Sequence, residues 1–374
     1  MLRFLTSGES HGKCLVAILE GMVAGLGVDA QDIDRELARR QEGYGRGGRM
    51  TIEKDRAEIL SGVRSGRSIG GPIALLVPNR DFKINELPVV KRPRPGHADL
   101  VGAMKYGRGD VRDILERASA RETTARVAVG AVCKAFLREF GVDLVSHVVA
   151  IGGVVAPTSG MPFGRIKKLS AASPMHCADP EATRRMMARV DEAKLMKDTI
   201  GGVFEVVATG VPVGLGSFVH YDRRLSARLC AALMSIQAVK GVEIGMGFGV
   251  ASRPGREVHD EIFHDRRKGF YRRTNRAGGF EGGVTNGEDL VLRAATKPYA
   301  TLMSPLKSVH IDTKKKEVAT VERSDVTAVP ACGVVGEAMV AFELALAFLE
   351  KFGGDSLKET RRNYDGYLKQ VREF

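Results

Sequence analysis

Two histidines in this 374-residue chain lie on loops of the kind that present a side chain to a ligand. The first is in Gly8-Glu9-Ser10-His11-Gly12, where glycine lets a ligand approach the backbone closely. The second, His97, follows the proline-stiffened segment Arg92-Pro93-Arg94-Pro95-Gly96 and precedes Asp99 by two residues. Histidine can donate a proton near neutral pH, so both are candidate acids. The first pentapeptide alone fits a simple turn equally well, and the second histidine favours a site.

Arginines supply the second chemical feature, which is affinity for anions. Arg39, Arg40, Arg46 and Arg49 surround a glycine-rich turn at residues 43–48. A guanidinium group can bind carboxylate or phosphate through two parallel hydrogen bonds, and glycine lets the backbone bend around such a ligand. A solvated basic turn fits the same residues, so the cluster indicates an anion site only in company with the histidines.

A predicted helix at residues 112–126 carries two further arginines. Arg117 and Arg121 lie one turn apart, so we expect them to share a face of this helix. Two i,i+4 pairs of opposite charge flank them and are typical of surface salt bridges: Arg112 with Glu116, and Glu122 with Arg126. Spacing alone therefore leaves Arg117 and Arg121 as candidates and no more.

Two short segments near the C-terminal third complete the candidates. Lys297-Pro298-Tyr299-Ala300-Thr301 places a cation on a rigid turn, and Arg323-Ser324-Asp325 brings a cation, a hydroxyl and a carboxylate together. Neither segment is diagnostic alone.

Two familiar patterns are excluded by their context. Residues 43–48 satisfy GxGxxG, but a dinucleotide-binding fingerprint needs a strand before it and a helix after it. Here a helical segment precedes the glycines and a β-like run at residues 50–53 follows them. His259 and His264 resemble a zinc-protease motif, yet their separation puts them on different helical faces, so we expect a solvated loop. We predict neither a Rossmann fold nor a metal site.

Composition bounds the class of protein. Lys and Arg number 57 against 45 for Asp and Glu, and the resulting net charge of +12 favours anionic partners. The five cysteines are far apart and form no CxxC pair, so they are expected to be reduced core thiols. We see no apolar stretch of membrane-spanning length and no signal peptide, which predicts a cytoplasmic protein without a membrane partner.

The order of predicted elements indicates an α+β fold. Helices are expected from Asp29, over residues 113–140, from Asp179-Pro180, and over residues 328–352 before Gly353-Gly354. Strand-like runs lie at residues 73–77, 142–151, 203–213 and 290–294. Strict strand-helix alternation is missing, which favours helices packed on antiparallel sheets. No linker marks a boundary, so residues 1–374 are predicted to form a single domain.

Together the motifs resemble chorismate synthase, and the resemblance covers nearly the whole chain. The matching segments, in order, are Gly8-Glu9-Ser10-His11-Gly12, residues 39–50, 94–99, 116–126, 278–288 and 322–325, with Pro330-Ala331. Members of this family convert 5-enolpyruvylshikimate 3-phosphate to chorismate by 1,4-anti elimination of phosphate, in the shikimate pathway of aromatic amino-acid biosynthesis. The substrate carries a phosphate and two carboxylates, which would explain a site rich in arginine.

The resemblance also implies a cofactor, because the hydrogen lost from C6 is not acidic enough for an ordinary side-chain base. The family uses reduced FMN with no net redox change. By motif, His11 would protonate the departing phosphate and His97 the reduced flavin, with Asp325, Ser10 and Ser119 assisting proton movement. The implied fold is a helical layer between two antiparallel sheets, assembled as a homotetramer.

Binding residues follow from the same resemblance. Flavin contacts would come from Arg117, Ala118, Ser119, Gln237, Ala238, Gly282, Lys297, Pro298, Tyr299, Ala300, Thr301 and Arg323. Substrate anions would bind Arg46, Arg49 and Arg121. Arg40 and Arg46 match family positions assigned to NADPH, a candidate reductant; since the chain has no long insertion, we expect it to depend on an external flavin reductant instead.

The chain departs from the family pattern in two places. Residues 79–91 are shorter than in many members and lack their usual tryptophan, which bears on the shape of the lid over the site. Tyr299 stands where an aliphatic residue is more common, which bears on flavin packing.

Two other classes of function are alternatives to this one. A basic nucleic-acid-binding protein would be expected to show a platform of basic and aromatic residues, but aromatic residues make up only 6% of the chain and tryptophan is missing from it. A flavin-dependent oxidoreductase would consume nicotinamide in proportion to product, so phosphate release without stoichiometric nicotinamide use would exclude it. The resemblance favours a phosphate-eliminating enzyme, with no nucleic-acid partner and with a flavin-dependent oxidoreductase as the alternative.

Overall fold

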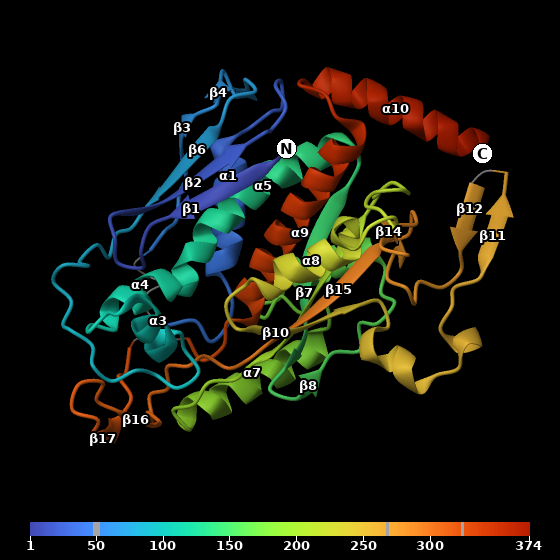
Figure 1. Cartoon of the computed structure of the whole chain (residues 1–374). Helices are drawn as coiled ribbons and strands as arrows, with labels where there is room; N and C mark the ends of the chain where they lie inside the picture. Colours follow the sequence, from blue (N-terminus) through green and yellow to red (C-terminus); the bar gives the residue numbers. More distant parts are fainter. Residues whose placement is uncertain (48–52, 267–268, 323–324) are drawn as a thin grey trace.

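The computed structural model of this protein describes residues 1–47, 53–266, 269–322 and 325–374. Two antiparallel sheets enclose a layer of helices (Figure 1). The first has four strands in the order β1 (Arg3–Ser7), β2 (Cys14–Glu20), β6 (Ile73–Pro78) and β3 (Glu58–Ser61). The second has five, in the order β10 (Val239–Ile244), β15 (Leu290–Thr296), β9 (Gly202–Thr209), β7 (Asp143–Ile151) and β8 (Val154–Val155).

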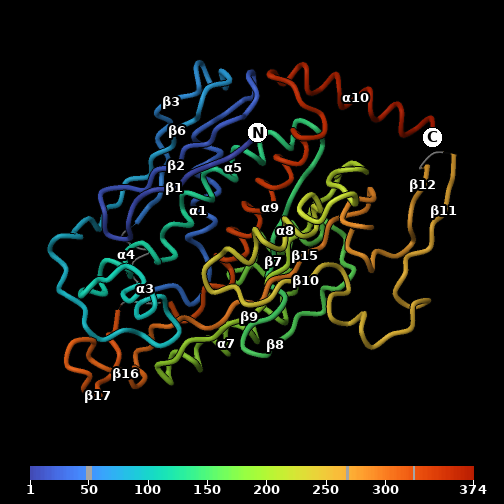
Figure 2. Tube along the Cα trace, viewed as in Figure 1, coloured from blue at the N-terminus to red at the C-terminus, as the bar shows by residue number. Residues whose placement is uncertain are grey.

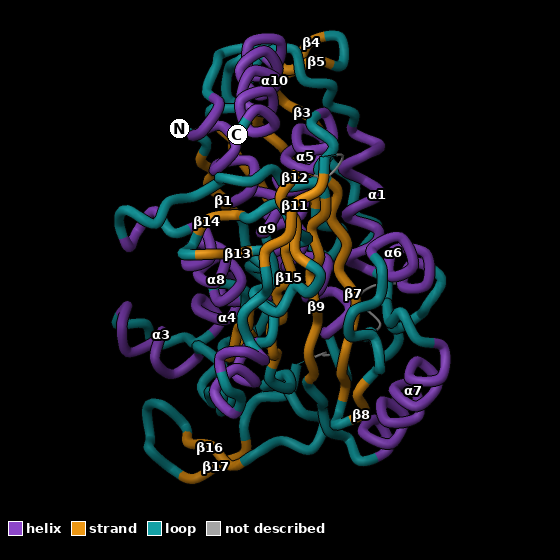
Figure 3. Tube along the Cα trace, turned by 90° about the vertical axis from the view of Figure 1, so that its right-hand side faces the viewer, coloured by secondary structure: helices purple, strands orange, loops and turns teal. Residues whose placement is uncertain are grey.

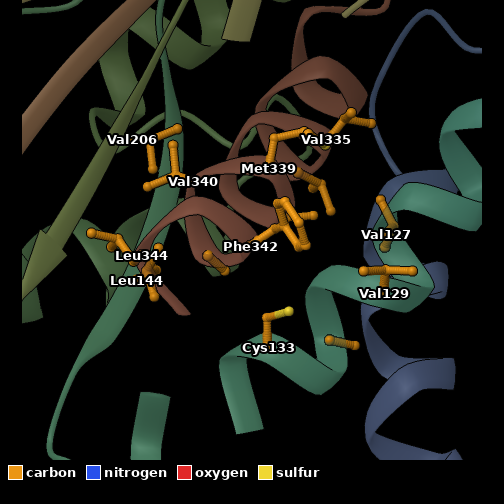
Figure 4. Packing of buried hydrophobic residues seen from close by; sticks show 14 of the residues in the cluster. Val127, Val129, Cys133, Leu144, Val206, Val335, Met339, Val340, Phe342 and Leu344 are labelled. Atoms are coloured by element: carbon orange, nitrogen blue, oxygen red, sulfur yellow. The ribbon is translucent and has the colours of Figure 1, made fainter. Parts of the chain in front are cut away.

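Three helices fill the space between the sheets: α1 (Ala30–Gln41), α5 (Thr123–Glu139) and α9 (Val329–Phe352). α5 packs on the first sheet and α9 on the second, and the two helices pack on each other. Figure 4 shows Val340 and Leu344 of α9 beside Val206 and Leu144 of the second sheet. The predicted fold, a helical layer between two antiparallel sheets, is confirmed.

Local sequence signals set several helix ends as predicted. Asp29 Oδ1 accepts a hydrogen bond from Gln31 N at 2.9 Å, which caps α1. Asp179 caps α7 (Pro180–Leu195) through Ala182 N at 2.7 Å, with Pro180 in the first turn. α9 ends at Gly353, whose φ of +60° suits a residue without a Cβ.

The expectation that the chain has no apolar stretch of membrane-spanning length is wrong for α9 by length and composition. This helix of 24 residues is long and apolar enough, by length and composition, to cross a membrane. Within its most apolar window, however, 78% of the residues are buried inside the protein. Because its side chains pack against both neighbouring layers, α9 is the core helix of the fold.

The predicted helix at residues 113–140 is also wrong as a single element. It consists of α4 (Arg112–Ala118), a 3-10 turn (Ala120–Glu122) and α5, separated at Ser119, whose φ and ψ of −63° and 143° are extended. The Ser119 hydroxyl accepts a hydrogen bond from Arg121 N at 3.3 Å, so the side chain competes with the helical backbone. Neither proline nor glycine marks this break in the sequence.

Several further elements were not predicted. The helices are α3 (Asp99–Tyr106), α6 (Phe163–Ala171), α8 (Leu225–Met234) and α10 (Leu357–Glu373). The short strand pairs are β4 (Val63–Arg64) with β5 (Arg67–Ser68), β11 (Ile262–Asp265) with β12 (Gly269–Arg272), β13 (Phe280–Glu281) with β14 (Val284–Thr285), and β16 (Lys307–Val309) with β17 (Lys316–Val318). In Figure 2 the β11–β12 pair extends away from the main body.

Two smaller predictions need correction. β9 ends at Thr209, four residues before the predicted end of that strand at residue 213. His264 lies on β11 and not in a loop. The view in Figure 3 places α6 and α7 beside β7 and β8, so one edge of the five-stranded sheet is covered by helices.

Candidate active site

Most of the predicted site residues line one cavity of about 420 Å³. Its walls come from the loop after β1, the end of α1, the break between α4 and α5, and the first turns of α9. The predicted residues on these walls are Ser10, His11, Arg40, Arg46, His97, Ser119, Arg121, Gln237, Tyr299, Ala300, Thr301 and Asp325. Segments far apart in the chain therefore meet at this cavity.

His11 is held by a buried carboxylate. Its Nδ1 lies 2.9 Å from Glu116 Oε1, and its backbone N–H donates to Glu116 Oε2 at 2.7 Å. Its Nε2 lies 3.8 Å from Asp81 Oδ2. Burial alone would raise the pKa of the Glu116 carboxyl, but the hydrogen bonds from His11 and the charge of Arg112 hold that pKa below its usual range. Glu116 is therefore ionised when it accepts from His11.

His97 has the same kind of partner. Its Nδ1 lies 2.5 Å from Asp99 Oδ1, and the Asp99 side chain is fully buried. Arg94 Nε donates to Asp99 Oδ2 at 2.8 Å, and its Nη1 donates to Thr301 Oγ1 at 2.8 Å. Burial would raise the pKa of Asp99, but the bonds from His97 and Arg94 outweigh burial and hold it well below its usual range.

Two buried guanidinium groups face the cavity with hydrogen-bonding capacity to spare. Arg40 Nε donates to Thr123 Oγ1 at 3.0 Å and Arg121 Nη1 to Asp55 Oδ2 at 2.7 Å. Among the described residues, Arg40 Nη1 and Arg121 Nη2 have no hydrogen-bond partner. Burial lowers the pKa of Arg40 from its usual value to about 10. Buried donors of this kind suit an anionic ligand.

Asp325 and the two serines lie on the same walls. Asp325 Oδ2 is 3.0 Å from Arg46 Nη1, and Asp325 Oδ1 accepts from Gly47 N at 2.5 Å. Ser119 Oγ donates to Ser10 Oγ at 3.3 Å. The break in the helix at Ser119 is what brings these two hydroxyls together.

The remaining predicted residues lie outside the cavity walls or outside the described residues. Arg117, Ala118, Ala238, Gly282, Lys297 and Pro298 are not among the lining residues. Arg49 and Arg323 lie outside the described part of the chain. Lys297 Nζ donates to the Gly96 carbonyl, so this side chain ties down the loop that carries His97.

The expectation that Arg117 and Arg121 share a helix face is wrong. The break at Ser119 separates them: Arg117 is exposed and donates to the carbonyls of Gly8 and Thr6 at 2.9 and 3.0 Å, whereas Arg121 is buried. The flanking pairs form as predicted but are not at the surface. Their distances are 3.7 Å for Arg112 to Glu116 and 2.9 Å for Arg126 to Glu122, all with mostly buried side chains.

Several lining residues were missed from the sequence. Lys83 and Arg94 add cations, Glu322 adds a carboxylate, and the apolar side chains are Leu87, Leu115, Ile236 and Val335. Arg94 was visible beside His97 in the sequence, but the apolar residues had no signal that separates them from ordinary core positions. The loop at residues 79–91 is anchored, since Lys83 N and Ile84 N both donate to the His11 carbonyl at 3.1 Å.

Two further observations concern Tyr299 and the capacity of the site to hold a metal ion. Tyr299 lines the cavity, and burial raises the pKa of its phenol. Over the described residues, no group of three or more His, Cys, Asp or Glu side chains is placed to hold a metal ion. The side chains named in the preceding paragraphs can bind anions and move protons.

Comparison with known proteins gives one consistent family. The family model described as chorismate synthase matches residues 2–349. A relative named chorismate synthase from Geobacter sulfurreducens is 58% identical over 100% of both chains, and one from Symbiobacterium thermophilum is 55% identical over 99% of both. A crystal structure titled as chorismate synthase is 44% identical, covers 100% of this chain and 99% of its own, and superposes with a TM-score of 0.84.

Proposed function

The chain belongs to the chorismate synthase family, and on that premise we propose that it converts 5-enolpyruvylshikimate 3-phosphate to chorismate by 1,4-anti elimination of phosphate. This makes it a carbon-oxygen lyase of the shikimate pathway, which supplies aromatic amino acids. The observation that carries the proposal is the meeting of His11, His97 and buried guanidinium groups at one cavity. Neither net hydride transfer nor nucleic-acid binding is favoured by the comparisons.

The donor set of the cavity fits a substrate with one phosphate and two carboxylates. Arg40 Nη1 and Arg121 Nη2 are buried donors without hydrogen-bond partners among the described residues. Carboxylate oxygens of Asp55 and Glu53 lie 3.8 and 3.7 Å from these two nitrogens, which is beyond hydrogen-bond distance. A buried donor without a hydrogen bond costs free energy, which an anionic ligand would recover. The proposed substrate ligands are Arg121 and Arg46, with Arg49 from outside the described residues, and Arg40 Nη1 is proposed as a further donor to the substrate.

The same cavity fits reduced FMN as cofactor. Apolar side chains of Leu115, Ile236 and Val335 lie beside the cationic ones, which suits a flat ring system that carries a phosphate. Held there, reduced FMN would supply electron density for breaking the C–O bond and an acceptor for the C6 hydrogen. The proposed ring contacts that line the cavity are Ser119, Gln237, Tyr299, Ala300 and Thr301.

Proton movement is assigned to the chain's own residues. His11 holds a proton at Nε2 for the departing phosphate, and His97 holds one on the flavin side. Asp325 is positioned by Arg46 and by the Gly47 N–H. The contact between Ser10 Oγ and Ser119 Oγ supports a role for both hydroxyls in proton movement beside His11.

We propose a homotetramer. Leu5 and Ile18 are 73% and 42% exposed on facing strands of the first sheet, and an apolar sheet face of this kind suits burial against another subunit. Gly282 supports the same proposal because it lies far from the cavity. Leu225 N, at the start of α8, donates to the Gly283 carbonyl, whereas Ile236 and Gln237, just past the other end of α8, line the cavity. A helix of ten residues spans about 15 Å. A flavin contact at Gly282 would therefore need a second copy.

Two further features of the protein are proposed. One hydrophobic cluster contains side chains of both sheets and of α1, α5 and α9, which supports one domain over residues 1–374. The five cysteines are free, which supports a cytoplasmic location.

The source of reducing power is proposed to be an external flavin reductant. Arg40 and Arg46 match family positions assigned to NADPH, but other partners account for both side chains. Arg46 pairs with Asp325, and the buried Arg40 Nη1 is proposed to donate to a substrate anion. Incubating the protein with FMN and NADPH under anaerobic conditions should give no NADPH oxidation above that of a protein-free control. Oxidation that depends on the protein would show that it reduces its own flavin.

The activity is tested by anaerobic incubation of the full chain with chemically reduced FMN and 5-enolpyruvylshikimate 3-phosphate. We expect chorismate and phosphate in equal amounts, and a flavin-free control should give neither. No product from folded protein would reject the proposed function.

A further inference from the structure

The carboxylate beside His11 determines which ring nitrogen carries a proton. An ionised carboxylate can only accept hydrogen bonds. Glu116 is 1% exposed and accepts from both the backbone N–H and the Nδ1 of His11. Arg112 Nη1 lies 3.7 Å from the same carboxylate and helps to keep it charged. His11 must therefore carry its proton on Nδ1, which leaves Nε2 as the nitrogen that can gain or lose one.

At His97 a different set of residues also places the proton on Nδ1. Asp99, the first residue of α3, accepts from His97 Nδ1 and from Arg94 Nε, so it is also ionised. Arg94 Nη2 lies 3.1 Å from His97 Nδ1, but a guanidinium group has no acceptor and cannot take that proton. Arginine, carboxylate and imidazole thus occur in the same order at both histidines.

Other histidine-carboxylate pairs among the described residues differ from these two in the ring nitrogen used or in exposure, and in a further pair His176 Nε2 lies 3.6 Å from Glu42 Oε2. His147 contacts Glu205 through Nε2 at 2.9 Å, which is the opposite nitrogen. His220 contacts Asp222 through Nδ1 at 2.8 Å with the same spacing in sequence as His97 and Asp99, but its side chain is 60% exposed. Neither pair lines the cavity.

We propose that Glu116 and Asp99 are positioning residues that fix His11 and His97 as Nδ1–H tautomers, so that both histidines exchange protons through Nε2. This deepens the proposed function and rests on it for the identity of the proton acceptors. At His11 the Nε2–H bond breaks and an O–H bond forms on the leaving phosphate. The neutral imidazole that remains still donates Nδ1–H to Glu116, so no other group has to move.

Charged groups of both signs lie around each imidazole. His11 faces Glu116 from α4 and Asp81 from the loop at residues 79–91, where Lys83 Nζ pairs with Asp81 Oδ1 at 2.7 Å. His97 faces Asp99 and Arg94, and Lys297 holds the carbonyl of the preceding Gly96. In each case the buried carboxylate is the group in direct contact with Nδ1.

The test is ¹⁵N-histidine NMR of the full chain without flavin, combined with turnover. In the wild-type protein the neutral forms of His11 and His97 should give the ¹⁵N pattern of the Nδ1–H tautomer. Glu116→Gln should change the pattern of His11 alone, since an amide can donate as well as accept, and Asp99→Asn should change that of His97 alone. We expect kcat to fall about tenfold to a hundredfold in each variant, with KM changed less than threefold.

Asp222→Asn is the matched control, because it alters an exposed pair with the same spacing and the same Nδ1 contact. It should leave kcat and the patterns of His11 and His97 unchanged. Glu116→Asp keeps the charge, so it should retain the Nδ1–H pattern and more activity than Glu116→Gln. Asp99→Asn carries the same test at His97 if the amide at position 116 prevents folding. Unchanged tautomers in folded Glu116→Gln or Asp99→Asn protein with kcat within twofold of wild type would overturn the proposal. The NMR result stands apart from the proposed activity, since it needs neither flavin nor substrate.

Discussion

The buried carboxylate of Glu337 in α9 gives the sharpest prediction about stability. Arg39 donates to both of its oxygens at 2.9 Å, Lys134 Nζ donates to Oε1, and Ser146 N donates to Oε2 at 2.8 Å. The Glu337 side chain is 1% exposed. Burial would raise its pKa, but Lys134 and Arg39 outweigh burial and hold that pKa well below the usual range. This cluster therefore stabilises the centre of the helical layer.

Glu337→Gln keeps the shape of the side chain and removes its charge. Each carboxylate oxygen has two donors, so the new NH₂ group must face two of them whichever way the amide turns. Two hydrogen bonds to a charged group are worth about 1.5–3 kcal/mol each. Breaking a buried ion pair by removing one partner costs about 3–5 kcal/mol, in the same range. We therefore expect the free energy of unfolding to fall by about 3–5 kcal/mol at pH 7.

The pH dependence of the same variant has a defined sign. A carboxyl group whose pKa is depressed in the folded protein stabilises it above the pKa of the unfolded chain, and this stability is lost as pH falls. The unfolded value is 4.5. The difference between wild type and Glu337→Gln should therefore be full at pH 7 and shrink steadily below about pH 4.5.

Urea unfolding at equal protein concentration measures this difference, provided that the m-values agree. Glu350→Gln is the matched control, since Glu350 lies on the same helix and pairs with Arg228 at 2.7 Å but is 45% exposed. Its cost should be below about 1 kcal/mol. A loss below about 1 kcal/mol for Glu337→Gln, or one that persists undiminished at pH 3, would refute the reasoning.

Three further predictions concern the site and the core. His11→Ala and His97→Ala should each slow chorismate formation by about a hundredfold or more, and a near-normal rate would remove that histidine from the mechanism. Arg40→Met should weaken substrate binding at least about tenfold by calorimetry, because one charge-assisted hydrogen bond is lost; unchanged affinity would contradict this. Gly130→Val should lower the free energy of unfolding, measured in urea, by about 1–3 kcal/mol or more, since a Cβ there would lie 2.3 Å from Ala338 Cβ. Gly164→Ala is the control and should not lower it, because the space around Gly164 is open.

Features carried by neighbouring residues could be predicted from the sequence. Asp29, Asp179 and Gly353 set helix ends as expected, because caps are read within a few residues. The loops of His11 and His97 were likewise visible from glycine and proline. Both loops line one cavity, as the resemblance to chorismate synthase implies.

Features that depend on distant partners could not be predicted. Glu116 reaches a residue 105 positions away, and its spacing from Arg112 looked like an ordinary surface pair. Glu337 interrupts an apolar helix, and its partner Arg39 is 298 positions away. The break at Ser119 follows from a side-chain hydrogen bond that competes with the helix, which no residue preference marks. In each case the deciding interaction is tertiary.

The central claim, elimination of phosphate without net redox change, is tested most directly by one ratio. Under argon, with reduced FMN below the substrate concentration, the phosphate released is compared with the reduced flavin oxidised over many turnovers. The account predicts chorismate equal to phosphate, with flavin oxidation close to zero. One flavin oxidised per phosphate released would contradict it and would indicate net hydride transfer.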